Sequence, residues 1–216
     1  LIYVTLGILL GALSAWTHGT KTDIGLLISI FSLGSWPPFF LSMLLIIAFS
    51  YKADLFPIGG ARSAEAARLT GFAQIWDVLY HGALPCLALV LVNLPGIYLI
   101  TRSSTLNVLG KDFVRTAHAK GVVKPRVLLR HALPNALLPI VTTIGMRFGF
   151  MLMGTMFVEV VFAYPGMGTL ITTAGAARDY PLLQGSFMVT MLFVLSFNML
   201  ADLLYSRLDP RVRRRR

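Results

Sequence analysis

The sequence is poor in residues that bind metals or carry out covalent chemistry. It has one cysteine, Cys86, and four histidines, His18, His81, His118 and His131, whose spacing is not that of metal ligands. A single cysteine excludes an intrachain disulfide and a cysteine-based metal site. The phosphate-binding pattern G-x-x-x-x-G-K-[ST] and the nucleophile pattern G-x-S-x-G are both absent. We therefore expect no metal, no cofactor and no catalytic residue in this chain.

Charge is also scarce. Charged residues make up 13% of the chain and hydrophobic residues 56%, whereas soluble domains carry about 25% charged residues. A helix of about twenty apolar residues crosses a hydrocarbon core of about 30 Å. We therefore predict an all-α polytopic membrane protein with five transmembrane helices. These coincide with five apolar runs: Leu1–Trp16, Ile24–Ser50, Leu84–Ile100, Ala136–Phe162 and Leu182–Tyr205.

The distribution of lysine and arginine predicts the orientation. Fourteen of the nineteen fall in the connection Thr17–Asp23, the loop 102–133 and the tail after Tyr205, four fall in the opposite loops, and Arg147 lies within a span. Cytoplasmic loops carry this excess, so we place the loop 102–133 and the C-terminus in the cytoplasm. The net charge of +10 is then juxtamembrane, where anionic lipid attracts each cation by about 1 kcal/mol, and nucleic acid is not expected as a partner. Leu1 would begin on the outer side, and we expect an N-terminally incomplete chain.

The basic loop has an internal pattern of two helices. Apolar residues spaced by three and four predict a helix over Thr105–Lys120, and they are Leu106, Leu109, Phe113, Ala117 and the nearby Val114. Gly121 is a suitable helix stop, and Pro125 suits the first turn of a second helix, Arg126–Ala132. Helical spacing places Val127, Leu128 and Ala132 roughly on one side of this second helix and Arg126 and Arg130 on another. Such an element can rest on lipid as an interfacial helix, and this alternative stays open.

The same loop carries the resemblance to a known family. Gly121 is followed, after nine residues, by His131-Ala132-Leu133-Pro134. This resembles the cytoplasmic signature E-A-A-x3-G-x9-I-x-L-P of ABC importer permeases, with Arg115-Thr116-Ala117 in the E-A-A place. Arg115 replaces the usual Glu and His131 the usual Ile, as in the dipeptide, oligopeptide and nickel branch. Segments 35–50, 83–110, 158–185 and 201–213 resemble that branch as well.

The resemblance implies a fold, a function and partners. The fold would be that of a type I ABC importer permease, normally with six spans, in which residues 1–216 form one transmembrane domain and 106–133 the coupling loop. The chain would import di- or oligopeptides or related small solutes across a bacterial or archaeal plasma membrane. It would pair with a second permease subunit, cytoplasmic ATPase subunits that hydrolyse the ATP, and an extracytoplasmic binding protein. The implied ATPase-coupling residues are Arg115, Thr116, Ala117, His118, Ala119, Lys120, Gly121, Leu133 and Pro134.

Three residues are candidates for the translocation path. Arg147 is a charge within a span, which is costly unless it faces a cavity or a partner. Glu159 is expected near the outer mouth, beside Tyr164-Pro165-Gly166, and Asn93 begins a stretch, with Pro95 and Gly96, that could break its helix or pack closely. The alternative function is a secondary transporter or channel that works without an ATPase. It is disfavoured because the spans offer few carboxylates and no detectable inverted repeat.

Overall fold

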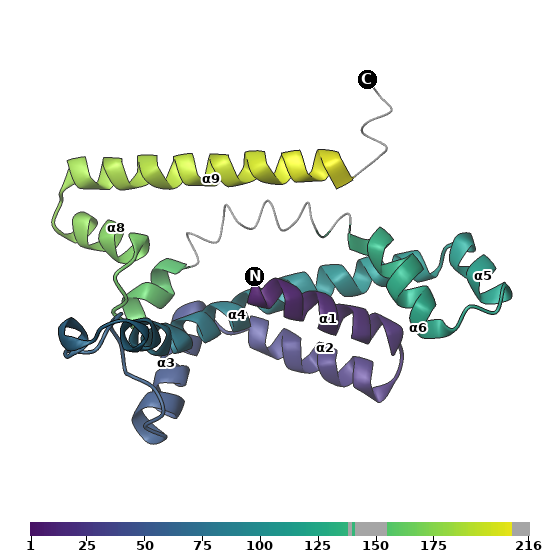
Figure 1. Cartoon of the computed structure of the whole chain (residues 1–216), viewed down its shortest axis with the longest axis horizontal. Helices are drawn as coiled ribbons and strands as arrows, with labels where there is room; N and C mark the ends of the chain where they lie inside the picture. The colour runs from purple at the N-terminus through teal and green to yellow at the C-terminus, as the bar shows by residue number, and fades with distance from the viewer. Residues whose placement is uncertain (138–139, 141–154, 209–216) are drawn as a thin grey trace. The chain divides into compact units, whose positions relative to one another are not determined.

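The computed structural model describes residues 1–137, 140 and 155–208 (Figure 1), without the side chains of His118, Lys124 and 201–208. All the regular elements in this part of the chain are helices, with no strand. This confirms the predicted all-α class. The chain divides into two compact units. Unit 1 comprises Leu1–Ser35, Asn93–Phe148 and Ser196–Arg216, and unit 2 comprises Trp36–Val92 and Gly149–Leu195.

Several helices have the length and composition of membrane spans. Helix α4 (Phe72–Leu109) and the segment Tyr180–Leu200 of α9 (Tyr180–Leu208) each pass this criterion alone. A bent helix pair passes it jointly, and α1 (Ile2–Trp16) is a shorter apolar helix. The predicted span Ala136–Phe162 lies largely outside the described residues. Within the described part, this set of helices agrees with a polytopic membrane protein.

The predicted span Ile24–Ser50 is not one straight helix. Instead, α2 (Lys21–Gly34) is followed by α3 (Pro38–Leu45), which continues as a π-helix, η1 (Ile46–Lys52). A short break at residues 35–37 separates the two halves. Pro37 and Pro38 cause the break, because a residue before proline is pushed out of the helical region. Pro38 then suits the first turn of α3.

Helix α4 is longer than the predicted span Leu84–Ile100. Its 38 residues amount to roughly 57 Å at 1.5 Å per residue, about twice the hydrocarbon thickness. The helix therefore continues past both ends of its apolar run. It is also unbroken at Asn93, Pro95 and Gly96, so the local break that the sequence allowed there does not occur.

In unit 1, α1 and α2 form an antiparallel hairpin beside the second half of α4 (Figure 1). A Cβ added to Gly7 would lie 2.7 Å from the Ile97 side chain, and one added to Gly11 would lie 2.7 Å from Thr101 Cβ. The spacing Gly7-x3-Gly11 is the small-residue pattern that lets two membrane helices approach closely. Gly34 of α2 packs in the same way on the Pro95 ring of α4.

Unit 2 has its own apolar core and a folded connection. The core residues are Leu41, Leu45, Leu84, Ala88, Val158 and Phe162. The connection before α4, which contains the short 3₁₀ helix η2 (Ala66–Arg68), is held by backbone donors. Gly60 N donates to the Phe162 carbonyl over 2.8 Å, and Ser63 N donates to the Asp77 carboxylate over 3.0 Å. Helix α8 (Met167–Ala176) follows the helical segment 155–161.

Candidate functional site

The basic loop of unit 1 is a helical hairpin at the end of α4 (Figure 1). Helix α4 ends at Leu109, α5 spans Asp112–Ala119, and the return helix comprises α6 (Lys124–Arg126) and the π-helix η3 (Val127–Ala132). The predicted single helix Thr105–Lys120 is therefore wrong, because the chain leaves the helix at Gly110 and Lys111. Glycine is a poor helix former, and the break separates α5 from α4.

The turn of the hairpin forms as its sequence predicts. Gly121 has a φ of +76°, a left-handed conformation that glycine adopts without a Cβ penalty. The N–H of Val122 donates to the Ala117 carbonyl over 3.2 Å and closes the end of α5. Pro125 lies in the first turn of the return helix, where its missing N–H costs nothing. That helix begins two residues before the predicted Arg126.

The hairpin has a buried side that is made by its own residues. These are Val108, Val114, Ala117, Val127, Leu128, Ala132 and Ala136, with Trp16, Leu109 and Val122 packed against them. The predicted apolar side of the return helix, Val127, Leu128 and Ala132, is thus confirmed as buried. Arg126 and Arg130, predicted on another side, are exposed. Because Trp16 belongs to α1 and Val108 to α4, the hairpin is joined to both helices.

The other side of α5 is exposed. Phe113 is 43% exposed, and Arg115, Thr116, Ala119 and Lys120 are exposed as well. Arg115 lies 3.7 Å from Asp112 in a solvent-exposed ion pair. The break at Gly110 and Lys111 rotates the predicted stripe, so that Val114 is buried while Phe113 points outward. The exposed face therefore combines one large apolar side chain with polar and cationic neighbours.

The predicted coupling residues do not all lie on this face. Ala117 is 8% exposed and belongs to the core of the hairpin. Leu133 is half-buried and Pro134 exposed. Leu133 also lines an apolar groove of about 280 Å³, together with α1 residues Leu9 and Leu13. The side chain of His118 lies outside the described ones. The coupling role of all these residues stays a prediction.

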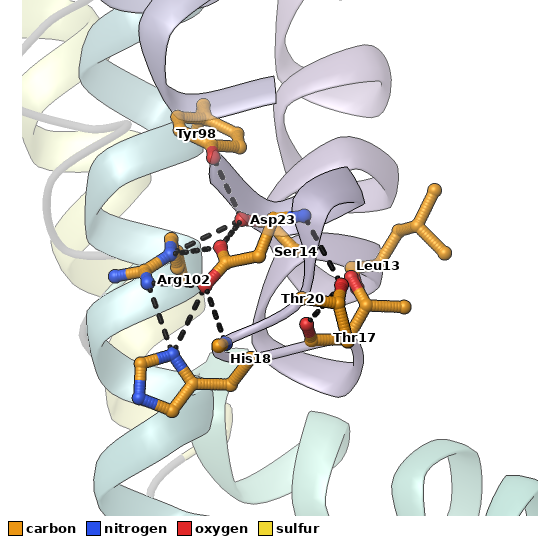
Figure 2. Close-up of polar contacts among 9 residues, drawn as sticks. Leu13, Ser14, Thr17, His18, Thr20, Asp23, Tyr98 and Arg102 are labelled. Atoms are coloured by element: carbon orange, nitrogen blue, oxygen red, sulfur yellow. Dashed lines mark hydrogen bonds and ion pairs between the residues drawn. The ribbon is translucent and has the colours of Figure 1, made fainter. Parts of the chain in front are cut away.

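A buried polar cluster, which the sequence analysis did not identify, fixes the α1–α2 hairpin to α4 (Figure 2). Arg102 of α4 binds Asp23 of α2 at two points: Nε lies 2.8 Å from Oδ1, and Nη2 lies 2.8 Å from Oδ2. Asp23 is 3% exposed, and the Arg102 side chain is 17% exposed. A two-point pair of this kind fixes orientation as well as distance.

The remaining lone pairs of the Asp23 carboxylate are also satisfied. Ser14 Oγ donates to Oδ1, while Gly19 N lies 3.1 Å and His18 Nδ1 3.0 Å from Oδ2. Ser14 Oγ also lies 2.7 Å from the hydroxyl of Tyr98. Because these groups come from α1, the following turn, α2 and α4, the cluster joins all three helices. Its sequence signal was weak: a lone acid and a lone arginine, 79 residues apart.

The candidate path residues have separate surroundings. The Glu159 carboxylate accepts hydrogen bonds from Gly168 N over 2.7 Å and Thr169 N over 3.1 Å, at the start of α8. A side chain on Gly166 would collide with that carboxylate, so the Tyr164-Pro165-Gly166 turn does lie beside it, as predicted. Asn93 lies within α4, and Arg147 lies outside the described residues. A role of these three in a translocation path stays a prediction.

Comparison with known proteins supplies the family. Residues 7–214 match the binding-protein-dependent transport system inner membrane component family. The dipeptide transport system permease protein of Escherichia coli K12 is 37% identical over 236 residues, covering 100% of this chain and 69% of its own length. The oligopeptide transport system permease protein of Bacillus subtilis 168 is 36% identical over 202 residues, covering 94% of this chain and 62% of its own length.

A third relative extends the range of named substrates. The glutathione transport system permease protein of Pectobacterium atrosepticum is 37% identical over 211 residues, covering 97% of this chain and 64% of its own length. The similarity to permease proteins of the peptide branch, predicted from the basic loop, is thus confirmed. The chain belongs to the family of binding-protein-dependent transport system inner membrane components, as a multi-pass permease protein of the inner membrane.

Proposed function

We propose that this chain is the membrane-spanning permease subunit of an ATP-driven ABC importer for di- or oligopeptides or related small solutes. The relatives that support the substrate class are named as dipeptide, oligopeptide and glutathione permeases. The observation that carries the mechanism is the hairpin of α5 and η3. Its apolar side is buried in its own core, and its other side exposes Phe113 beside polar and cationic residues.

The exposed face of the hairpin gives the chain a surface through which the movement of another protein can be transmitted to its helices. An exposed aromatic side chain surrounded by polar groups is a typical anchor of a protein interface. In the proposed assembly, a cytoplasmic ATPase subunit holds this face and hydrolyses ATP, while the chain itself is not an enzyme. A second permease subunit completes the path, and an extracytoplasmic binding protein delivers the solute. Movement of the ATPase subunits then opens the path alternately to the two sides.

The orientation is part of the proposal. The excess of lysine and arginine supports a cytoplasmic hairpin and C-terminus, and outer loops that include Ser63 and Ala176. In a chain whose Cys86 is replaced by serine, a cysteine at Ser63 or Ala176 should react with an impermeant thiol reagent in intact cells. A cysteine at Lys120 should not. Labelling of Lys120→Cys from outside would show the orientation to be reversed.

The coupling face is tested by placing a charge on it. Phe113→Glu adds a carboxylate at the centre of the proposed interface, and an unpaired charge buried there costs several kcal/mol. The variant should still insert into the membrane, yet lose the ATPase subunit on copurification and lose ATP-driven peptide uptake. Ser103→Glu is the matched control, because Ser103 is an exposed residue of α4 outside the hairpin, and it should keep both properties.

Two results would contradict the proposal. One is a Phe113→Glu variant that retains both the ATPase subunit and ATP-driven uptake. The other is peptide uptake by the chain in vesicles that contain an ion gradient but no ATPase, which would favour a secondary transporter. Ala117→Glu is a poorer test, because Ala117 lies in the hairpin core and a charge there would unfold the hairpin itself.

A further inference from the structure

The Asp23–Arg102 cluster lies near the end of α1 and the end of α4, where both helices meet the hairpin of α5 and η3. Arg102 precedes the end of α4 at Leu109 by seven residues, roughly 10 Å along the helix. Ser14 precedes Trp16 by two residues at the end of α1, and Trp16 packs against the core of the hairpin. The cluster therefore joins α1 and α4 close to the points where each meets the hairpin.

We infer that Asp23 and Arg102 are positioning residues that make α1, α2 and the second half of α4 move with the coupling hairpin as one body. This inference rests on the proposed function, since it assigns a consequence to movement of the hairpin. Polar bonds with two-point geometry resist both sliding and rotation of one helix on another. Close apolar packing, as at Gly7 and Gly11, prevents α1 and α4 from coming closer together. It has no directional bonds, so it does not fix one specific position of α1 along or around α4.

The number and direction of the bonds separate this cluster from an ordinary surface ion pair. Asp23 Oδ1 takes the Arg102 Nε and Ser14 donors, and Oδ2 takes the Arg102 Nη2 and Gly19 donors. If α4 turned without α1 and α2, Asp23 would keep Ser14 and Gly19 but lose the guanidinium. A buried carboxylate would then lack its cation, which is strongly unfavourable. Movement of the three helices together avoids that state.

In this arrangement the hairpin cannot shift the end of α4 alone. A displacement imposed on the hairpin is carried through Val108 to α4 and through Trp16 to α1, and the ion pair keeps the two responses equal. When the pair is removed, part of the displacement is absorbed between the helices. ATP is then hydrolysed with less transport per cycle.

The test measures rigidity directly in the full assembly of permease, ATPase and binding-protein subunits. Spin labels are attached at Gly25→Cys on α2 and Ser103→Cys on α4, both exposed, after the exposed Cys86 is replaced by serine. With the native pair, the label-to-label distance should be the same with and without ATP. In Asp23→Asn, the distance distribution should broaden or shift when ATP is added.

The same assemblies, without labels, are used to measure uptake of labelled dialanine per ATP hydrolysed. Asp23→Asn should lower this ratio by about threefold to tenfold, in the range of coupling effects from single substitutions, while ATP hydrolysis continues. Arg102→Lys keeps the charge but loses the two-point contact, so an intermediate ratio is expected, and it serves if Asp23→Asn does not assemble. Lys21→Gln, which removes an exposed charge from the same turn of α2, should leave the ratio unchanged.

Different results would overturn the proposed function and the role of the Asp23–Arg102 pair. If the assembly with the native pair shows no ATP-driven uptake, the proposed function is wrong, whatever the variants do. If that assembly transports while Asp23→Asn and Arg102→Lys keep both the distance and the uptake ratio, the pair is only a structural contact and the inference is overturned.

Discussion

Two buried or half-buried carboxylates, one in each unit, have their negative charge stabilised by different kinds of hydrogen-bond donor. The chain has only nine Asp and Glu residues, and Asp23 and Glu159 are each surrounded by donors. Asp23 meets the guanidinium of Arg102, 79 residues away in the sequence. Glu159 meets the backbone N–H groups at the start of α8, nine and ten residues ahead.

The difference lies in what each contact fixes. Glu159 is stabilised by the positive end of a helix, so its bonds shape one local turn and determine where α8 begins. Asp23 is stabilised by a full charge on a separate helix, so its bonds fix the position of α1 and α2 on α4. Loss of the first contact should loosen a turn, whereas loss of the second should loosen a unit.

The largest effect is expected from breaking the Asp23 contact. Arg102→Met keeps much of the side-chain volume but leaves the Asp23 carboxylate buried without its cation, which costs about 3–5 kcal/mol. The free energy of unfolding, measured by denaturation in mixed micelles, should fall by this amount. Arg115→Gln is the matched control, because the Asp112–Arg115 pair is exposed and such pairs add little to stability. Equal stability of the two variants would show that the buried pair is not a strong contact.

A smaller effect is expected from the helix packing that supports the pair. Gly11→Ala places a Cβ 2.7 Å from Thr101 Cβ, and overpacking of this kind costs about 1–3 kcal/mol. Gly25→Ala, on the exposed side of α2 with nothing within 4 Å, should instead stabilise the chain by about 0.5–1 kcal/mol, as alanine is the better helix former. The midpoint temperature of thermal unfolding in detergent should therefore fall in Gly11→Ala and rise in Gly25→Ala. A fall in both variants would indicate that Gly25 also faces another helix.

The smallest effect is expected at Glu159. Glu159→Ala removes the acceptor for the first N–H groups of α8, and loss of such a cap costs about 1 kcal/mol. Amide hydrogen exchange should accelerate at Gly168 and Thr169 and stay unchanged at the Asp23 cluster. If exchange accelerates at Arg102 as well, the two carboxylates are coupled and the comparison fails.

The hairpin shows how much of the site could be predicted from the sequence. Its turn was predicted correctly because Gly121 and Pro125 act within one or two residues of themselves. Helical spacing alone placed Val127, Leu128 and Ala132 on one side of the return helix, and the structure shows that this side is the buried one. The predicted single helix Thr105–Lys120 is wrong, because the break at Gly110 depends on whether continuing α4 or packing Val114 into the hairpin buries more apolar surface. The outcome depends on tertiary contacts, which the local sequence does not specify.

The membrane spans also have features that the sequence predicts and features that only the structure shows. Composition and apolar runs were sufficient to predict an all-α membrane protein, because every backbone group in lipid must be bonded within its own helix. Counting apolar residues could not predict where α4 ends, since its helix continues beyond the apolar layer. It also missed the helix break after Gly34, although Pro37 and Pro38 mark the place in the sequence.

The sequence by itself determined the class of the protein, the helical hairpin with its glycine turn, and the relationship to peptide permeases, because these depend on composition and on patterns within about thirty residues. The tertiary structure alone decided that Ala117 is buried while Phe113 faces outward, and that Asp23 meets Arg102. The reason is physical. Spacing along a helix specifies which residues share a face, but the face that becomes buried, and the charge that it meets there, depend on helices that are distant in the sequence.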